Sequence, residues 1–311
     1  MKMRAQAALA ALAAAVILCA CEGLASPPVR NGASPRFVPP AAQESQRGGV
    51  ALVLSGGAAR GYAHVGVIKV LEANGLRPDL IVGTSSGSIV GALYASGLTA
   101  AELEAAIAEL DERVFMDLAW PSLGILPGGM GLMRGDRLHR FIDDRVKHHH
   151  IEDFPIRFAA VATDLATGEA QIFNAGDVGL AARASSAAPG ILAPLEIGTR
   201  KYGDGQLSSP IPVDAARRLG ARVVIAVDVI YPPQDAAPSN AIGILFQAFL
   251  ITVHRLKSVE VARADVVIAP ELGRTSGQFS FADRERLTAA GERAALEALD
   301  RLRPLFAGRN P

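Results

Sequence analysis

The chain has 311 residues, half of them apolar, and its 31 basic residues balance its 31 acidic residues. This length and apolar content predict a globular protein with a sizeable buried core. The charge balance argues against a nucleic-acid-binding protein, because such proteins carry a strongly basic surface.

The N-terminus has the pattern of an export signal. Two basic residues, Lys2 and Arg4, precede an uncharged apolar run from Ala5 to Leu18. That run is too short to span a bilayer comfortably, and a positive start followed by a short apolar core is typical of secretory signals. We therefore predict a signal peptide over residues 1–20.

The end of this segment, "LCAC", resembles the lipobox of bacterial lipoproteins, in which a small residue precedes the cysteine that is lipidated. Cys21 is the predicted lipidation site, although Cys19 stands where a small residue without a thiol is usual. Glu22 follows, and by the same resemblance a residue other than Asp there favours the outer membrane. The predicted location is the cell envelope, with the protein lipid-anchored in the outer membrane, and an ordinary signal peptide is the alternative.

Both cysteines of the sequence lie in this segment, so the remainder contains no thiol. That excludes disulfides, thiol catalysis and thiolate metal sites beyond it. Residues 21–49 are rich in Pro, Ser, Gly and Ala and lack apolar periodicity, which predicts an extended tether. We predict one domain over residues 50–311.

Short apolar runs and helical patterns alternate in this domain. Val50–Leu54 reads as a buried strand that enters the glycine-rich turn "SGGAARG", and Leu80–Val82 is the next strand. A helix follows each: one marked by Val65, Ile68 and Leu71, the other at Ile89–Tyr94. The alternation predicts an α/β fold with a mostly parallel central sheet flanked by helices. Further strands are predicted at Phe158–Thr163, Val223–Val229 and Ala264–Ile268, and a final helix at Arg284–Leu302.

One apolar stretch, Ala241–Val253, bears on how the protein meets a membrane. It is too short to span a bilayer. We favour a helix buried in the core, and a helix that faces lipid or covers the site as a lid is the alternative.

The turn after the second strand carries Gly-x-Ser-x-Gly, with Ser85 at its centre. A serine on a sharp turn between strand and helix projects to where a substrate reaches it, and Gly83 and Gly87 avoid side-chain clashes. A helix that starts at Ser86 adds free N–H groups and a positive dipole end near the hydroxyl. Ser85 is the predicted nucleophile.

Acyl transfer also requires donors for the oxyanion, and the glycine-rich turn supplies them. In a parallel sheet the turn at Gly56, Gly57 and Ala58 lies beside the serine turn, so its N–H groups are the predicted oxyanion hole. A phosphate-binding loop is the competing interpretation. The glycines, including Gly61, lack the dinucleotide-binding spacing, and no Gly-Lys-Ser/Thr follows.

Two residues are candidates for the base that takes the serine proton. In the α/β-hydrolase order of Ser, acid and His, only His254 comes late enough, yet its surroundings are helical and only one strand precedes the strand that leads into Ser85. Asp204 lies between two glycines in "YGDGQ", a turn suited to a partly desolvated carboxylate beside the serine. The His148–His150 cluster beside Lys147 is typical of a solvated surface, and no second motif supports a metal there.

Taken together, five segments resemble the patatin-like phospholipases and cover most of the predicted domain. In chain order they are "LVLSGGAARGYAHVGVIKVLE", "GTSSG", "VATDLATGE", "ASSAAPG" and "YGDGQLSSPIPV". The resemblance implies a three-layer patatin-like fold and a Ser–Asp dyad without histidine, in which Asp204 takes the proton of Ser85. It also implies Arg60 beside the oxyanion hole, Gly205 as the glycine of an Asp-Gly motif, activity on lipid acyl esters, and neither metal nor organic cofactor.

The sequence departs from the family pattern at three positions. Ala58 stands where a third glycine is frequent, Gln206 where a second glycine often follows the Asp, and Ser209 where Asn is frequent. A residue with a side chain at position 58 is under strain if the turn needs a positive φ. These residues flank the reacting groups, so we expect altered geometry or specificity and retained activity.

The predicted function is therefore a serine acyl hydrolase that cleaves phospholipids or lysophospholipids through an acyl-enzyme. Its predicted partners are that lipid and a membrane surface reached through the lipid anchor, with no nucleic acid. Two alternatives stay open: a soluble-ester hydrolase or thioesterase that uses His254, and a catalytically silent envelope protein that binds lipid or a protein partner.

Overall fold

The structure is a computed structural model that describes residues 34–40, 49–115, 117, 131–147, 149–233, 238, 240–273 and 281–307. The predicted signal peptide and Cys21 lie outside the described residues. Among the helices of these ranges, none combines the length and the apolar character needed to cross a membrane.

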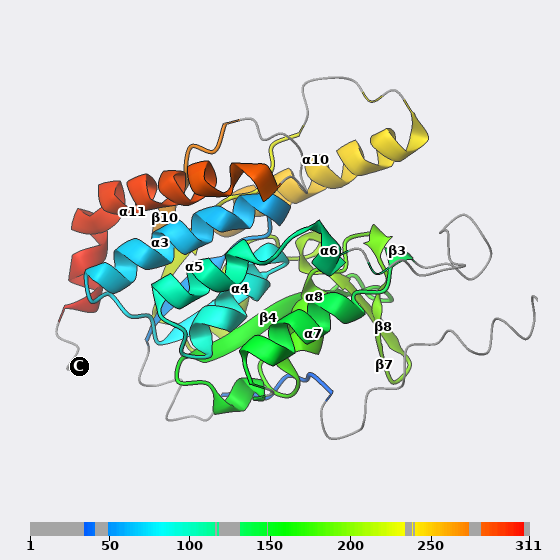
Figure 1. Ribbon diagram of the computed structural model, residues 1–311, viewed down its shortest axis with the longest axis horizontal. Helices are drawn as coiled ribbons and strands as arrows, with labels where there is room; N and C mark the ends of the chain where they lie inside the picture. The colour runs from blue at the N-terminus through cyan, green and yellow to red at the C-terminus, as the bar shows by residue number, and fades with distance from the viewer. Residues whose placement is uncertain are drawn as a thin grey trace, which may run out of the picture. The chain divides into compact units, whose positions relative to one another are not determined.

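A central sheet organises the described chain (Figure 1). Its strands are β1 (Val50–Leu54), β2 (Leu80–Thr84), β4 (Arg157–Asp164), β5 (Ala170–Phe173), β7 (Leu195–Ile197), β8 (Arg200–Asp204), β9 (Val223–Val227) and β10 (Val266–Ile268). They lie in the order β10-β9-β1-β2-β4-β8-β7, with β5 paired to β4. The first five strands in that order run parallel, whereas β5 and β8 run antiparallel to β4, and β7 antiparallel to β8. This confirms the predicted mostly parallel sheet.

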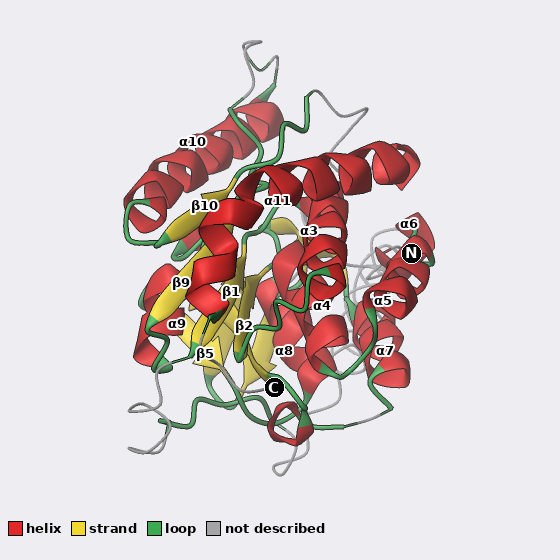
Figure 2. Ribbon diagram, turned by 90° about the vertical axis from the view of Figure 1, so that its left-hand side faces the viewer, coloured by secondary structure: helices red, strands yellow, loops and turns green. Residues whose placement is uncertain are grey.

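Helices cover both faces of this sheet (Figure 2). One face carries α3 (Tyr62–Ala73), α4 (Ser86–Ala95), α5 (Ala100–Ala108), α7 (Asp136–Arg145), α8 (Val178–Ser185) and α11 (Arg284–Phe306). The other face carries α9 (Val213–Arg218) and α10 (Ala241–Val261). The short elements of the described residues are η1 (Ala58–Gly61), α6 (Glu112–Phe115), η2 (Ile151–Asp153), η3 (Gly205–Leu207), η4 (Phe281–Asp283) and the paired strands β3 (Gly131–Met133) and β6 (Gly190–Leu192).

The core follows from the alternation of side chains along the strands. Leu52 and Leu54 of β1 join the cluster under α3, α4 and α11, whereas Ala51 and Val53 join the cluster under α9. Strands that are covered on both faces bury every residue, which explains why β1 and β2 read as continuous apolar runs. The result is the three-layer arrangement that the family resemblance implies.

The helix predicted at Ala241–Val253 exists and continues to Val261, but its predicted burial in the core is wrong. Leu250 and Val253 are buried, whereas Ile244 and Leu245 are 56% and 72% exposed. Apolar composition shows that side chains avoid water, but it does not show what covers them. The alternative prediction, a helix that faces lipid or covers the site as a lid, therefore remains.

Part of the predicted tether also packs against the body. Arg36 forms an isolated bridge with Ala175, and the backbone of Val38 exchanges hydrogen bonds of 2.7 and 2.8 Å with the Asn174 amide. Phe37 packs against the core cluster under α9. The packed chain therefore includes residues 34–40, before the boundary expected at residue 50.

Candidate active site

The register of β4 brings the ends of two distant strands together. Thr84, the last residue of β2, pairs with Val161, and Asp204, the last residue of β8, pairs with Ala162. Both strands lie along the same edge of β4, because β5 occupies the opposite edge at these residues. Since β2 and β8 run in opposite directions, their carboxyl ends meet there, and Ser85 follows directly after Thr84.

Ser85 and Asp204 are in direct contact as a result. The Ser85 hydroxyl donates a hydrogen bond of 2.9 Å to Asp204 Oδ2, and the N–H of Gln206 donates one of 2.9 Å to Asp204 Oδ1. Both side chains are buried. Burial raises the pKa of Asp204 to about 7, and the hydrogen bonds from Gln206 and Ser85 act against that rise. A carboxylate of this pKa is suited to take up a proton near neutral pH.

The nucleophile turn is strained and held by side chains around it. Ser85 has φ 52° and ψ −124°, a conformation that residues with a Cβ rarely adopt. Its N–H donates to the hydroxyl of Ser185 (2.9 Å), which donates in turn to the carbonyl of Val161 (2.6 Å). The Ser88 hydroxyl donates to the Ser85 carbonyl (2.6 Å). These bonds fix the direction of the hydroxyl.

Close backbone approach explains the glycines of both motifs. A Cβ on Gly83 would lie 2.4 Å from the Gly87 carbonyl oxygen, and one on Gly87 would lie 2.3 Å from the Leu54 carbonyl oxygen. At Gly205 a Cβ would lie 2.1 Å from the carbonyl oxygen of Val161. Side chains at these positions would therefore force β1, α4 and β4 apart.

The glycine-rich turn lies beside the nucleophile, as predicted for parallel strands. Ala58 has φ 45° and lines the same pocket as Ser85. In the described ranges, the N–H groups of Gly57 and Ala58 have no hydrogen-bond acceptor. Among the amides of the predicted oxyanion hole, these two are left to bind an oxyanion.

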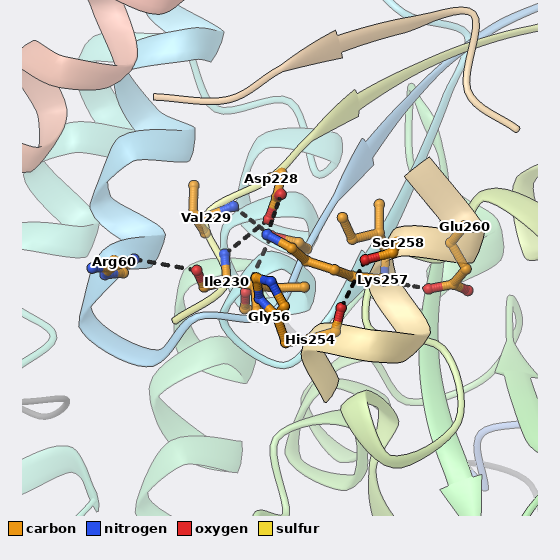
Figure 3. A network of polar contacts seen from close by, with 11 residues as sticks. Gly56, Arg60, Asp228, Val229, Ile230, His254, Lys257, Ser258 and Glu260 are labelled. Carbon is orange, nitrogen blue, oxygen red and sulfur yellow. Dashed lines mark hydrogen bonds and ion pairs between the residues drawn. The ribbon is translucent and has the colours of Figure 1, made fainter. Parts of the chain in front are cut away.

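Two members of the predicted oxyanion hole serve other contacts. The N–H of Gly56 donates to the carbonyl of Pro210 (3.2 Å). The Arg60 guanidinium donates to the carbonyls of Ile230 (3.2 Å, Figure 3) and Gly273 (2.7 Å) and lies 4.1 Å from the ring centre of Tyr231. We therefore correct the prediction to Gly57 and Ala58, because the Gly56 N–H and both terminal nitrogens of the Arg60 guanidinium already donate to carbonyls.

His254 is not placed as the base of a Ser-His-Asp triad. It lies on α10, where its Nδ1 is buried without a hydrogen-bond partner in the described chain. The Asp204 carboxylate instead contacts the Ser85 hydroxyl and the Gln206 N–H. In a triad the imidazole stands between the acid and the serine.

Of the other described histidines, one is buried, one is paired with a carboxylate and one is exposed. His64 is fully buried, its Nε2 lies 2.9 Å from the Ser55 carbonyl, and burial lowers its pKa to about 4. His139, Asp143 and Asp177 are the one group of the described residues close enough to share a metal ion, and His139 is already paired with Asp177 at 3.2 Å. His149 is exposed, and His148 lies outside the described residues.

A pocket with a largely apolar wall leads to Ser85 and Asp204. Ser85, Asp204 and Ala58 lie on it. Its apolar wall includes Ile89 and Val90 of α4, Phe246 and Phe249 of α10, Leu110 after α5 and Ile191 of β6. A nucleophile with an adjacent base, unpaired amides and an apolar wall fits an ester with a hydrocarbon acyl chain.

Comparison with known families gives one match by a family model. The model described as "Patatin-like phospholipase" matches residues 52–217, which include Ser85 and Asp204. An uncharacterised NTE family protein of Mycobacterium tuberculosis is 35% identical over 215 residues, which are 68% of this chain and 55% of that protein. The chain thus spans about half the length of this relative.

Longer relatives and solved structures are also similar to the chain. Patatin-like phospholipase domain-containing protein 6 of Homo sapiens is 31% identical, over 75% of this chain and 16% of that protein. Lysophospholipase NTE1 of Kluyveromyces lactis is 33% identical to the chain, over 58% of this chain and 12% of that protein. The crystal structure of VipD from Legionella pneumophila has a TM-score of 0.49 and 13% identity, and covers 90% of this chain and 72% of its own.

Proposed function

The chain belongs to the patatin-like phospholipase family, and from this premise we propose that it is a serine lipid acyl hydrolase of the phospholipase A or lysophospholipase type. The observation that carries the proposal is the 2.9 Å hydrogen bond from Ser85 to Asp204 at an apolar pocket. The relative from Kluyveromyces lactis bears the name lysophospholipase, which supports a lipid substrate.

In the proposed first step, Ser85 Oγ attacks the ester carbonyl carbon while Asp204 takes the hydroxyl proton. The charge that develops on the carbonyl oxygen faces the N–H groups of Gly57 and Ala58. When the tetrahedral intermediate collapses, the ester C–O bond breaks and Asp204 returns the proton to the departing alkoxide. The products are an alcohol, such as a lysophospholipid, and an acyl-Ser85 ester.

The second step hydrolyses the acyl-enzyme and regenerates the free enzyme. Asp204 takes a proton from a water molecule, which attacks the acyl carbon, and the same two amides stabilise the second oxyanion. Collapse releases the fatty acid and gives the proton back to Ser85. The raised pKa of Asp204, about 7, suits both roles because the group gives up its proton again at neutral pH.

We also propose that the mature protein is lipid-anchored at Cys21 in the cell envelope. The support is the sequence alone: the basic start, the apolar run and the lipobox-like end. A Cys21→Ala variant expressed in a bacterium with two membranes is expected to lose incorporated radiolabelled fatty acid and to leave the membrane fraction. Unchanged labelling would contradict the anchor without bearing on catalysis.

The experiment for the enzymatic proposal is hydrolysis of a panel of phospholipids, lysophospholipids, acyl thioesters and short-chain esters by the full chain. Ser85→Ala and Asp204→Asn are expected to lose at least about a thousandfold in rate, and His254→Ala to stay within about threefold. Loss of activity in His254→Ala would favour the triad. A folded parent that cleaves no member of the panel would favour the silent envelope protein.

A further inference from the structure

The first half of α10 presents two apolar surfaces with different surroundings. Phe246 and Phe249 line the pocket that contains Ser85. Ile244, Leu245 and Ile251 are instead 56%, 72% and 41% exposed. Four of the eight large apolar residues that are exposed in the described chain lie on this helix, so the exposure is concentrated there.

The exposed residues form one continuous face. Ile244, Ala248 and Ile251 are four and three positions apart, which places them on one side of a helix, and Leu245 lies beside them. Ala248 and Thr252 are exposed with them, and no charged residue interrupts the face before Arg255. In Figure 1 the N-terminal end of α10 extends past the neighbouring helices and strands. We call Ile244, Leu245, Ala248 and Ile251 the α10 apolar face.

The second half of the helix is fixed by buried polar contacts (Figure 3). Lys257 forms an ion pair of 2.7 Å with Asp228 after β9, and both side chains are largely buried. Glu260 accepts hydrogen bonds from the Ser209 hydroxyl and from the N–H of Ile211 (2.8 Å). These contacts attach α10 to the segments that follow β8 and β9, so the apolar face keeps a set direction relative to the pocket.

We propose that the α10 apolar face docks on a phospholipid surface and that acyl chains enter the pocket past Phe246 and Phe249. The inference rests on the proposed function for the nature of the substrate. A lipid surface is the occupant that fits, because the face is aliphatic and continues through the same helical turns into the apolar wall beside Ser85. A substrate that moves along this path leaves the membrane without crossing water.

A tryptophan placed on the face tests docking independently of catalysis. The full chain with Leu245→Trp is compared with Leu296→Trp, since Leu296 is 54% exposed on α11 and does not line the pocket. Each variant carries Ser85→Ala and is mixed with phosphatidylcholine–phosphatidylglycerol vesicles that contain brominated acyl chains. The same protein without an added tryptophan gives the fluorescence of the single native Trp, which is subtracted as background. Quenching of the added tryptophan by at least about twofold is expected at position 245 and none at position 296.

The signal comes from one side chain, so membrane binding by another segment does not reproduce it. An unquenched tryptophan at position 245 in protein that sediments with the vesicles would overturn the proposal. A dimer in solution that is abolished by Ile244→Ser/Leu245→Ser, with no quenching, would assign the face to a second copy of the chain instead.

Kinetics supply the second readout. Ile244→Ser/Leu245→Ser is expected to lower hydrolysis of vesicle phospholipid by at least about tenfold. Hydrolysis of a dissolved short-chain ester should stay within about twofold, because neither side chain lines the pocket. Leu296→Ser is the matched control and should change neither rate. An equal loss on both substrates, or none on either, would overturn the docking role. If the parent hydrolyses no ester, the proposed function fails, and the quenching experiment alone decides the docking.

Discussion

The hydroxyl of Ser85 donates directly to the carboxylate of Asp204 at 2.9 Å, although 119 positions separate the two residues in the sequence. Their proximity comes from sheet register, since the ends of β2 and β8 pair with consecutive residues of β4. A site built on strands holds its groups more accurately than one built on long loops. The pair is therefore in place before substrate binds.

The first prediction concerns the pH dependence of the rate. Asp204 accepts a proton only when it is ionised, and burial raises its pKa to about 7. We expect kcat/KM for a dissolved ester to rise about tenfold per pH unit below that value and to level off above it. A stopped assay from about pH 5 to about pH 9 measures this. A midpoint near that of an ordinary carboxyl group would contradict the role of Asp204.

Glu260→Gln is the control for that profile. Burial also raises the pKa of Glu260 to about 7, but its carboxylate contacts Ser209 and Ile211 and not the dyad. The pH profile of the rate should therefore survive this substitution. Loss of the midpoint in Glu260→Gln would mean that Glu260, and not Asp204, produces it.

The second prediction concerns stability. The folded protein holds the protons of Asp204 and Glu260 more tightly than the unfolded chain, because both pKa values are raised to about 7 from ordinary values of 3.8 and 4.5. The stabilisation is complete at acidic pH and is lost as the pH rises through about 7. The free energy of unfolding in urea should therefore fall as the pH rises from the ordinary pKa values to about 7. Glu260→Gln should reduce the slope of this free energy against pH. Glu297→Gln, which changes an exposed carboxylate, is the reference variant. A slope in Glu260→Gln equal to that of the reference would contradict the predicted contribution of Glu260 to stability.

The third prediction concerns Ser185, which positions the nucleophile. Ser185→Ala removes the acceptor of the Ser85 N–H and the donor to Val161. A buried group left unsatisfied costs about 1–3 kcal/mol, so the melting temperature should fall. We expect kcat to fall by about tenfold with little change in KM, because the strained turn loses its support. Ser96→Ala, at the end of α4, is the control. Full activity of folded Ser185→Ala would refute the positioning role.

The fourth prediction concerns the strained Ala58. A left-handed φ costs a residue with a Cβ about 1–2 kcal/mol, which glycine avoids at an entropic cost of about 0.4–1 kcal/mol. Ala58→Gly should therefore raise the free energy of unfolding by about 0.5 kcal/mol and keep activity. Ala59→Gly, in the same turn, should lower it by about 1 kcal/mol. Equal destabilisation by both substitutions, measured by urea unfolding, would contradict the strain.

The sequence predicts the elements around the nucleophile well. Val50–Leu54 is β1 with the same bounds, because a strand covered on both faces is apolar at every position. The glycines around Ser85 are predicted for the right reason, since a Cβ at either one would collide with backbone atoms. The constraint on Gly83 comes from its sequence neighbour Gly87, whereas the constraint on Gly87 comes from Leu54 at the end of β1.

Long-range geometry is what local pattern does not determine. The antiparallel pairing of β8 with β4, which brings Asp204 to Ser85, has no local signal. The position of the turn suggested Gly56 for the oxyanion hole, and the family resemblance placed Arg60 beside it. The Gly56 N–H instead donates to Pro210, and the Arg60 guanidinium donates to Ile230 and Gly273. Ser185 lies in the block "ASSAAPG", which marked the segment but not the hydrogen bond that its hydroxyl makes.

The most direct test of the account is the rate at which a fluorophosphonate labels Ser85, followed by intact-protein mass spectrometry. Reaction of this serine requires the same proton transfer as acylation and does not depend on which lipid is the substrate. The account predicts that Asp204→Asn slows labelling by at least about a hundredfold and that His254→Gln leaves it unchanged. Equal labelling of the parent and Asp204→Asn, or a matching loss in His254→Gln, would contradict a base role for Asp204.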